Sequence, residues 1–304
     1  MKYIFIINGR SEKADARQQL QQMLEEEAAG EQYEVYTTTG TSDATHYTRA
    51  YCEANPDEEI CFVACGGDGT IKEVASGLVG FEHKTLAVMP FGGTGNDFIK
   101  YYCGGDLKSG PDFTHVRNIF AGHDTLIDIL RVNNEYSINV CNFGFDSVVA
   151  DTANKRIKRG KTKNAYRWGI VKAIFTGRFN RIDVSVDGEH MGGKRMLLCT
   201  LANNHYVGGE FFCAPRAKND DGLIDVCYVR TMTLMMFMKL LPIYTAGKHL
   251  DNPKYGHKIL YRQGRHIDVT APGIIGLCLD GDMLYDHTFS IDILPKAINF
   301  RIPA

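Results

Sequence analysis

The sequence predicts two domains, the first an α/β domain with a doubly wound parallel sheet and the second an all-β, sandwich-like domain. Up to about residue 123, short apolar runs alternate with helical segments, which is typical of parallel strands joined by crossover helices. Beyond that point, short strand-like runs joined by turn residues dominate the chain. The length of 304 residues also suits two domains of about 150 residues each.

The elements expected in the first domain, residues 1–125, follow from its residue pattern. Short runs rich in apolar and β-branched residues predict strands at residues 2–7, 33–36, 60–65 and 85–89. Between them, helices are expected at residues 11–28, 43–54 and 70–79, with another beginning near residue 95. Such sheets bind ligands beyond the carboxyl ends of their strands, where Asn8 and Thr38 would both lie.

The second domain, residues 126–289, is expected to be mostly strand. Its strand-like runs are residues 126–132, 136–140, 181–186, 196–201, 223–229, 258–261, 266–270 and 276–279. Turn dipeptides such as Asn133-Asn134 and Asp187-Gly188 join some of these runs. Helices are expected within residues 147–178 and 233–249, and residues 289–302 look like a closing segment.

Two glycine-rich turns each carry an aspartate and follow a buried type of strand. The first is Gly66-Gly67-Asp68-Gly69-Thr70, and the second runs from Gly92 to Asp97. Glycines let main-chain N–H groups approach a ligand closely, and a turn that opens a helix directs unpaired N–H groups at an anion. Two such turns at one sheet edge predict a polyphosphate pocket. The alternative is a pair of tight strand-to-helix turns with nothing bound.

The composition narrows the function classes. A net charge of −2 gives no global basic field, so nucleic acid is not an expected partner. The nine cysteines lie mostly in apolar runs without zinc-ligand spacing, which favours reduced thiols in a cytoplasmic protein. No run approaches the roughly 20 apolar residues of a membrane span, and the first apolar run is too short for a signal peptide.

Four segments resemble the signatures of one known family. Gly66–Thr70 is similar to the nucleotide signature of its superfamily, and Gly93–Phe98 is similar to a narrower second signature. Ala214–Val226 resembles the motif of the family's C-terminal domain, and Leu279–Asp282 resembles its catalytic Asp-Gly-Glu. The family is that of the soluble, diacylglycerol-kinase-like lipid kinases of bacteria, which are related to sphingosine kinases and more distantly to NAD kinases. The resemblance covers essentially the whole chain.

This resemblance implies that ATP and a lipid meet in the cleft between the two domains, with Mg²⁺ as the metal. It also implies that the segment 290–304 returns to pack on the first domain. The sequence departs from the family pattern in three places. The turn at Asn8-Gly9 lacks the usual proline and the last glycine, Gly92-Gly93 contains one extra glycine, and Asp282 replaces the usual glutamate.

The resemblance gives the acidic residues distinct roles. Asp282 would accept the proton of the lipid hydroxyl during phosphoryl transfer. Asp280 would orient this base or bind Mg²⁺, and Asp68 and Asp97 would organise the loops and the Mg²⁺–phosphate unit. The alternative for Asp280–Asp282 is a simple hairpin turn, since Asp-Gly is a common turn dipeptide.

The residues expected to contact the nucleotide belong to the strand-end turns. They are Asn8, Thr38, Gly66, Gly67, Asp68, Gly69, Thr70, Ile71, Lys72, Thr94, Gly95 and Asn96. Lys72 would either meet a phosphate or be solvated, and the solvated interpretation is favoured.

A structural Mg²⁺ is also implied by the resemblance. Asp221 and the main-chain carbonyls of Lys218 and Leu223 would hold it, with Asp128 reaching it through water. Hard oxygen ligands of this kind suit Mg²⁺. The alternative is an acidic turn without a metal.

Two segments offer contacts to lipid. The basic run Lys155–Lys163 would hold anionic headgroups at a membrane surface, or would simply be a solvated loop. Met232–Met238 could line an acyl groove, although a buried helix is favoured. The single tryptophan, Trp168, is given no role.

The sequence thus suggests an ATP- and Mg²⁺-dependent lipid kinase that is cytoplasmic and transiently at the inner face of the membrane. Diacylglycerol is the default acceptor, by resemblance alone. Other acceptors left open are phosphatidylglycerol, a sphingoid base, a polyprenol and NAD. From another class, the alternative is a nucleotide-binding regulatory protein without catalysis, for which Asp282 and the altered first turn are the support in the sequence. A lipid is the expected partner, and a homodimer is left open.

Overall fold

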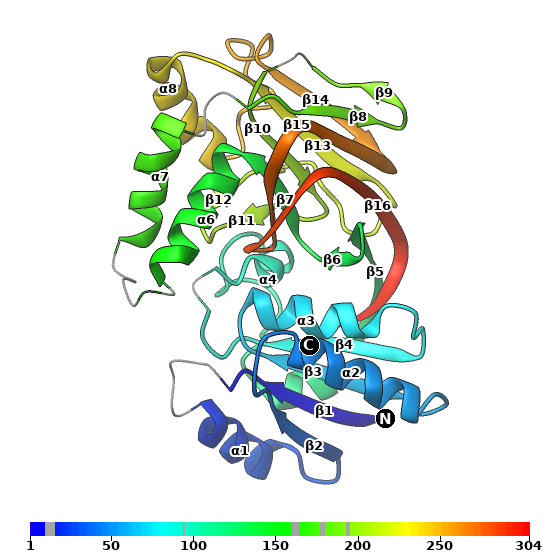
Figure 1. The fold of residues 1–304 in the computed structure, drawn as a ribbon. Helices are drawn as coiled ribbons and strands as arrows, with labels where there is room; N and C mark the ends of the chain where they lie inside the picture. The colour runs from blue at the N-terminus through cyan, green and yellow to red at the C-terminus, as the bar shows by residue number, and fades with distance from the viewer. Residues whose placement is uncertain (10–15, 94, 158, 160–163, 177–179, 193–194) are drawn as a thin grey trace. The chain divides into compact units, whose positions relative to one another are not determined.

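The computed structural model describes the chain except residues 10–15, 94, 158, 160–163, 177–179 and 193–194 (Figure 1). Its contacts divide the chain into two compact units. The first unit is Met1–Ile129 with Pro295–Ala304, and the second is Leu130–Leu294. The boundaries expected from the sequence were residues 125 and 290.

The first unit is built on a parallel sheet in the order β16-β4-β3-β1-β2. Its strands are β1 (Lys2–Ile7), β2 (Gln32–Thr37), β3 (Ile60–Cys65) and β4 (Lys84–Met89), with the end of β16 (Asp282–Ile302) pairing with β4. The register is even, because the last residues of β1 to β4 pair with one another across the sheet: Ile7 with Thr37 and Cys65, and Cys65 with Met89. The four carboxyl ends therefore form one straight edge.

Helices cover both faces of this sheet. Side chains of α1 (Ala16–Glu27) and α5 (Val116–Phe120) pack on one face, in a core that includes Phe5 and Val63. The adjacent α2 (Asp43–Ala54) and α3 (Asp68–Leu78) belong to the other face. The short α4 (Asp97–Tyr102) follows the turn after β4. The unit is a doubly wound α/β domain, as the sequence predicted.

The second unit contains an antiparallel sheet in the order β14-β13-β10-β7-β15-β16. Its strands are the C-terminal end of β5 (His123–Val132), β6 (Glu135–Ser137), β7 (Val140–Gly144), β8 (Asp183–Val186), β9 (Glu189–His190), β10 (Met196–Ala202), β13 (Ile224–Arg230), β14 (Ile259–Gly264) and β15 (His266–Leu279), with the N-terminal part of β16. A separate small hairpin joins β11 (Tyr206–Val207) and β12 (Phe211–Phe212).

The long strand β15 links two layers of this unit. Its first half, Ile267–Thr270, pairs with β8, and its last residues, Leu277–Leu279, pair with β7. The register with β16 shifts between Thr270 and Ile275, at the point where the strand passes from one layer to the other. A buried apolar core fills the space between the layers. The unit is therefore sandwich-like, as predicted.

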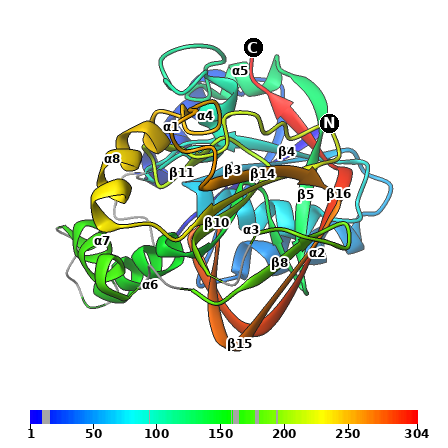
Figure 2. The same cartoon turned by 90° about the horizontal axis from the view of Figure 1, so that it is seen from above.

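Three helices cover the outer face of the sheet in the second unit. They are α6 (Phe145–Ile157), α7 (Ala165–Thr176) and α8 (Leu234–Thr245), and Figures 1 and 2 show them on one flank. They enclose a second apolar core that includes Phe145, Phe237 and Tyr244.

In the part of the chain that the structure describes, no helix is both long enough and apolar enough to cross a membrane. All nine cysteines are buried free thiols.

Candidate functional site

The turns after β1, β2 and β3 are joined to one another by backbone contacts at the carboxyl edge of the first unit's sheet. The amide of Asn8 donates to the carbonyl of Cys65 at 3.3 Å, and the amide of Gly9 donates to Thr38 Oγ1 at 3.1 Å. A Cβ atom on Gly9 would lie 2.1 Å from the carbonyl oxygen of Thr38. Any side chain at Gly9 would therefore push the first two turns apart.

The two glycine-rich turns touch each other through their backbones. A Cβ atom on Gly67 would lie 3.0 Å from the Cα of Gly93, and one on Gly93 would lie 2.9 Å from the Cα of Gly67. At Gly66, a Cβ atom would lie 2.4 Å from Thr70 Oγ1. Glycine is thus required at these three positions by the packing of the turns themselves, before any ligand is considered.

The aspartates of the two turns converge on Gly95. A Cβ atom built on this glycine would lie 2.9 Å from Asp68 Oδ2 and 3.0 Å from Asp97 Oδ2. The other oxygen of Asp68 accepts the backbone N–H of Phe98 at 3.0 Å, and Lys100 Nζ lies 3.9 Å from Asp97. Asp68 therefore ties the first turn to the helix that opens after the second.

This carboxylate pair has the chemistry of a Mg²⁺ site. Mg²⁺ is usually held by one or two carboxylates together with substrate phosphates and water. Among the described residues, no group of three or more His, Cys, Asp or Glu side chains forms a self-sufficient metal cage. Asp68 and Asp97 would hold Mg²⁺ here only when phosphate oxygens complete its coordination.

Other predicted nucleotide residues lie around this edge. Thr38 and Thr70 are buried, Ile71 is in the core, and Gly69 has open space beside it. Thr94 lies outside the described residues. Asn96 has a left-handed backbone with φ of 51°, and its buried Oδ1 has no hydrogen-bond partner in the described structure. Such an orphaned acceptor is satisfied if a bound ligand donates to it.

The structure contradicts the favoured expectation that the side chain of Lys72 is solvated. The residue is only 7% exposed on α3, so the expectation of a solvated side chain is wrong. Lys72 is the fifth residue of α3, and its side chain is covered by the protein rather than extended into water.

A pocket of about 320 Å³ adjoins the second glycine turn. Pro90, Gly92, Gly93 and Asn96 line one side, and the rest of the wall is apolar or hydroxylic: Ile99, Leu107, Phe113 and Thr114. Gly92 and Gly93 both have positive φ, a backbone conformation that glycine adopts without steric strain. Its size and mixed lining suit part of a nucleotide.

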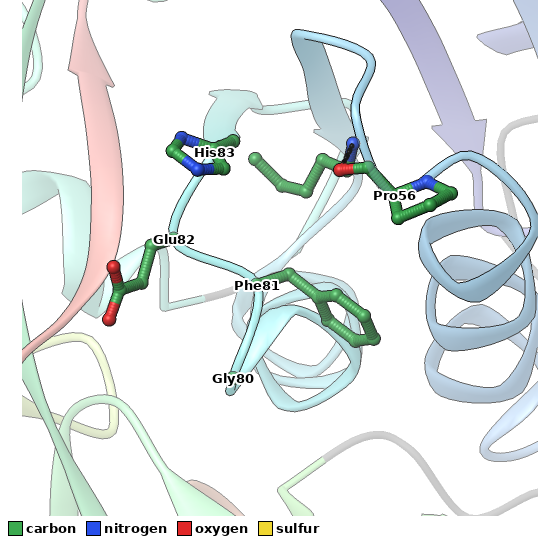
Figure 3. A pocket seen from close by; sticks show the side chains of 6 residues that line it. Pro56, Gly80, Phe81, Glu82 and His83 are labelled. Atoms are coloured by element: carbon green, nitrogen blue, oxygen red, sulfur yellow. Dashed lines mark hydrogen bonds between the residues drawn. The ribbon is translucent and has the colours of Figure 1, made fainter.

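A second pocket of about 240 Å³ lies at the opposite, amino-terminal edge of the same sheet, where β4 begins (Figure 3). It is lined by Pro56, Gly80, Phe81, Glu82, His83 and Lys84. The ammonium of Lys84 donates to the carbonyls of Asn55, at 2.6 Å, and of Pro56 and Glu58. Those bonds use all three donors of Lys84, so its ammonium group holds the segment that precedes β3.

In the second unit, Asp280 and Gly281 form the two-residue turn of the β15–β16 hairpin. Both have positive φ, 49° and 97°, as a tight primed turn requires. The Asp280 carboxylate accepts three backbone N–H groups, from Ile138 at 2.8 Å, Asn139 at 3.1 Å and Val140 at 2.9 Å. Asp280 thus fixes the turn, and Asp282, the first residue of β16, is exposed beside it. The hairpin interpretation and a catalytic Asp282 are compatible.

Asp146 is a candidate that sequence reasoning missed. It is the second residue of α6, two residues after Gly144, which has φ of 84° at the end of β7. Burial raises the pKa of its carboxyl to about 7. Burial also raises the pKa of Cys278 on the neighbouring β15, and the negative charges of Asp280, Asp146 and Asp282 add to that rise. The signal available in the sequence was an aspartate that follows a strand and a glycine at the start of a helix.

The direct ligands of the predicted structural metal site lie in an acidic turn before β13. Asp221 Oδ1 accepts the backbone N–H of Leu223 at 3.0 Å, which shapes the acidic turn. Burial raises the pKa of Asp225, hydrogen bonds from Tyr261 and Gln263 oppose that rise, and the charge of Asp221 adds to it. Asp221 is exposed, and an exposed carboxylate is the type of hard oxygen ligand that Mg²⁺ prefers.

Asp128 belongs to the first unit, whereas Asp221 belongs to the second. Asp128 is fully buried, and its Oδ1 accepts the backbone N–H of Lys296 at 2.7 Å. This bond ties the C-terminal segment to β5.

The basic run is described only in part, because residues 158 and 160–163 lie outside the described residues. Lys155 forms an ion pair with Asp151 at 2.8 Å on α6, and the guanidinium of Arg156 lies 5.1 Å from the ring centre of Trp168. Both cationic side chains therefore contact neighbouring residues of the protein.

Comparison with known proteins agrees with this geometry. Residues 2–132 match the diacylglycerol kinase catalytic domain, and residues 139–301 match the YegS C-terminal NAD kinase beta sandwich-like domain. The fold, the paired turns and these matches define the chain as a lipid kinase. It belongs to the diacylglycerol-kinase-like family.

The chain is similar to proteins named diacylglycerol kinase. It is 29% identical over 280 residues to that of Bacillus subtilis (strain 168), covering 91% of this chain and 88% of the relative. It is 26% identical over 280 residues to that of Staphylococcus aureus (strain bovine RF122 / ET3-1), covering 91% and 84%. A crystal structure of a diacylglycerol kinase from Bacillus anthracis str. Sterne has the same fold, with a TM-score of 0.70, 20% identity and coverage of 99% and 96%.

Proposed function

We propose that this lipid kinase transfers the γ-phosphoryl group of ATP to a lipid hydroxyl with the help of Mg²⁺, and that diacylglycerol is the acceptor. The observation that carries the proposal is the backbone contact of Gly67 with Gly93, which brings Asp68 and Asp97 to one point. The names of the relatives favour diacylglycerol.

The nucleotide would bind along the carboxyl edge of the first unit. Main-chain N–H groups of the glycine turns would donate to its phosphates, and the dipole of α3 favours negative charge there. Asp68 and Asp97 would hold Mg²⁺, which would neutralise charge on the phosphates during transfer. The pocket beside Gly92 would accept another part of the nucleotide, which could donate to the orphaned Oδ1 of Asn96.

Asp282 would act as the general base for the acceptor. Its exposed carboxylate would take the proton of the lipid hydroxyl as oxygen attacks phosphorus. Asp280 would be a positioning residue, because its three amide bonds hold the turn that presents Asp282. Aspartate is one methylene, about 1.5 Å, shorter than the family's glutamate, and catalytic geometry is sensitive to about 1 Å.

The test is a panel of acceptors. Purified protein would receive Mg²⁺, labelled ATP and, in separate reactions, diacylglycerol, phosphatidylglycerol, a sphingoid base, a polyprenol or NAD. Label on diacylglycerol is expected. Label only on NAD would contradict the lipid acceptor, and label only on another lipid would replace diacylglycerol. Nucleotide binding without any transfer would favour a regulatory protein.

We also propose a cytoplasmic location, with transient action at the inner face of the membrane. The nine buried, free thiols are those of a protein that stays in a reducing compartment.

A further inference from the structure

Six large apolar side chains are exposed together on α7 and α8. They are Trp168 (54% exposed), Val171 (47%) and Phe175 (78%) on α7, and Leu234 (39%), Met235 (71%) and Met238 (53%) on α8. In the described part of the chain, 13 large apolar residues are exposed, so nearly half of them lie on these two helices. We call these six residues the α7–α8 surface.

The α7–α8 surface is distinct from the face that each helix packs on the protein. On α7, Ala173 is buried and Ile170 and Ile174 are partly buried in the core that α8 shares. On α8, Phe237, Leu240 and Tyr244 are buried in the same core. Each helix therefore has a second apolar face with no protein against it in the described structure. A helix on the surface of a protein normally presents polar residues there.

The spacing shows that the exposed residues form an apolar stripe along each helix. Trp168, Val171 and Phe175 are three and four residues apart, which places them on one side of α7. Met235 and Met238 are three residues apart and therefore lie on one side of α8. Figures 1 and 2 place both helices on the same flank of the second unit.

The charges around the stripe identify what covers it. Neither α7 nor α8 contains an acidic residue, whereas Lys172 and Lys239 are exposed beside the apolar side chains. The guanidinium of Arg156 lies 5.1 Å from the ring centre of Trp168, so a further cation borders the stripe. An apolar face edged by cations matches an anionic bilayer, because acyl chains accept the apolar groups and headgroup phosphates accept the cations. Tryptophan is also favoured at the interface of a bilayer.

The α7–α8 surface is also connected to the predicted catalytic hairpin. Helix α7 packs closely on α6, since a Cβ atom on Gly169 would lie 2.6 Å from the carbonyl oxygen of Val149. Asn154 of α6 in turn donates to the carbonyl of Gly281 at 2.7 Å. A membrane bound at this surface would thus lie one helix away from the turn that carries Asp282.

We propose that the α7–α8 surface docks on an anionic lipid bilayer. The proposal rests on the lipid-kinase function and adds to it the surface by which the enzyme reaches a substrate held in a membrane. It differs from the basic run at Lys155–Lys163 because the apolar stripe supplies the insertion and the cations border it.

The test is sedimentation with vesicles in the absence of ATP. Vesicles of phosphatidylcholine containing about one-third phosphatidylglycerol should bind the protein. The double change Phe175→Ser and Met235→Ser should weaken this binding by roughly tenfold or more, since both side chains would insert among acyl chains. The matched control is Ile274→Ser, which changes a side chain that is 68% exposed elsewhere on the second unit and should leave binding unchanged.

Two further measurements keep the proposal falsifiable. Phe175→Trp should bind vesicles at least as well as the wild type, and Lys172→Gln with Lys239→Gln should reduce the preference for anionic over neutral vesicles. Equal vesicle binding by the wild type and the double serine variant would overturn the proposal. So would a wild-type dimer that the serine changes dissociate without effect on vesicles, because the surface would then join two copies of the chain. None of these readouts depends on which acceptor is phosphorylated.

Discussion

Asp280 and Asp146 show how single carboxylates in the second unit differ in role. Three amides surround Asp280, so its charge is satisfied and its turn is rigid. For Asp146, burial raises the pKa of the carboxyl to about 7. The sequence could suggest Asp280 from its turn chemistry, but the burial of Asp146 depends on strands and helices distant in the chain.

The raised pKa of Asp146 makes a prediction about stability and pH. An unfolded aspartate loses its proton near pH 4, whereas the folded one keeps it until about pH 7. The folded state therefore binds more protons in this window, so the stability contributed by Asp146 falls as the pH rises from about 4 to about 7 and then levels off. Asp146→Asn removes this dependence. The melting temperatures of the wild type and Asp146→Asn, measured against pH, should diverge through that window. Parallel curves would contradict the raised pKa of Asp146.

Lys84 makes a prediction that concerns stability alone. Lys84→Met would leave the carbonyls of Asn55, Pro56 and Glu58 without their donor, at a cost of at least about 2 kcal/mol in the free energy of unfolding. Urea unfolding measures this loss, with the exposed neighbour His83→Ala as control. Nucleotide affinity should be unchanged, because Lys84 lies at the amino-terminal edge of the sheet. A stable variant, or one with weakened ATP binding, would contradict the structural role.

At the scale of elements, the glycine turns are determined by their contact with each other. Gly67→Ala would place a Cβ atom 3.0 Å from the Cα of Gly93, so the turns must separate. We expect a loss of about 1–3 kcal/mol in the free energy of unfolding, together with weaker ATP binding. Urea unfolding and ATP titration measure the two effects.

Gly69→Ala is the matched control for that change. It lies in the same turn, at the start of α3, and a Cβ atom there would meet nothing within 4 Å. Its stability should be equal to that of the wild type or higher by up to about 1 kcal/mol, because alanine favours the helix. If Gly67→Ala and Gly69→Ala behaved alike in unfolding, the contact between the turns would not be what requires glycine.

The acidic turn at Asp221 predicts a response to metal. Mg²⁺ should raise the melting temperature of the wild type in the absence of nucleotide, and Asp221→Ala should reduce this shift. Asp220→Ala, which changes the exposed neighbour, should retain it. Equal Mg²⁺ responses of the wild type and Asp221→Ala would remove the structural metal from the account.

Sequence patterns predicted most elements well, and the exceptions have physical causes. Strand β3 has the expected bounds because its apolar run ends sharply at the glycine turn. Residues 266–270 and 276–279 looked like two strands, but they are one strand, β15, that shifts register at the intervening segment. Met232–Met238 was favoured as a buried helix, yet Met235 and Met238 of α8 are exposed. An apolar sequence does not reveal which of its faces the protein leaves uncovered.

At the scale of the whole molecule, the two-domain fold could be predicted because its signals are local. Alternating strands and helices give way to short strands, and each glycine turn follows its own strand. The site could be predicted only as far as local chemistry reaches. The convergence of Asp68 and Asp97 on Gly95, the burial of Lys72 and the apolar stripe of the α7–α8 surface all depend on packing between distant segments.

Phosphoryl transfer by variants of Asp282 tests most directly whether this carboxylate is the base of the reaction. Labelled ATP and diacylglycerol would be given to the wild type, Asp282→Ala and Asp282→Glu, with Asp286→Ala as an exposed control on the same strand. ATP affinity would be measured on the same samples. We expect Asp282→Ala to lower the transfer rate by roughly 10²–10⁴ with unchanged ATP affinity, while Asp282→Glu and Asp286→Ala remain active. Transfer by Asp282→Ala at the wild-type rate would contradict this expectation.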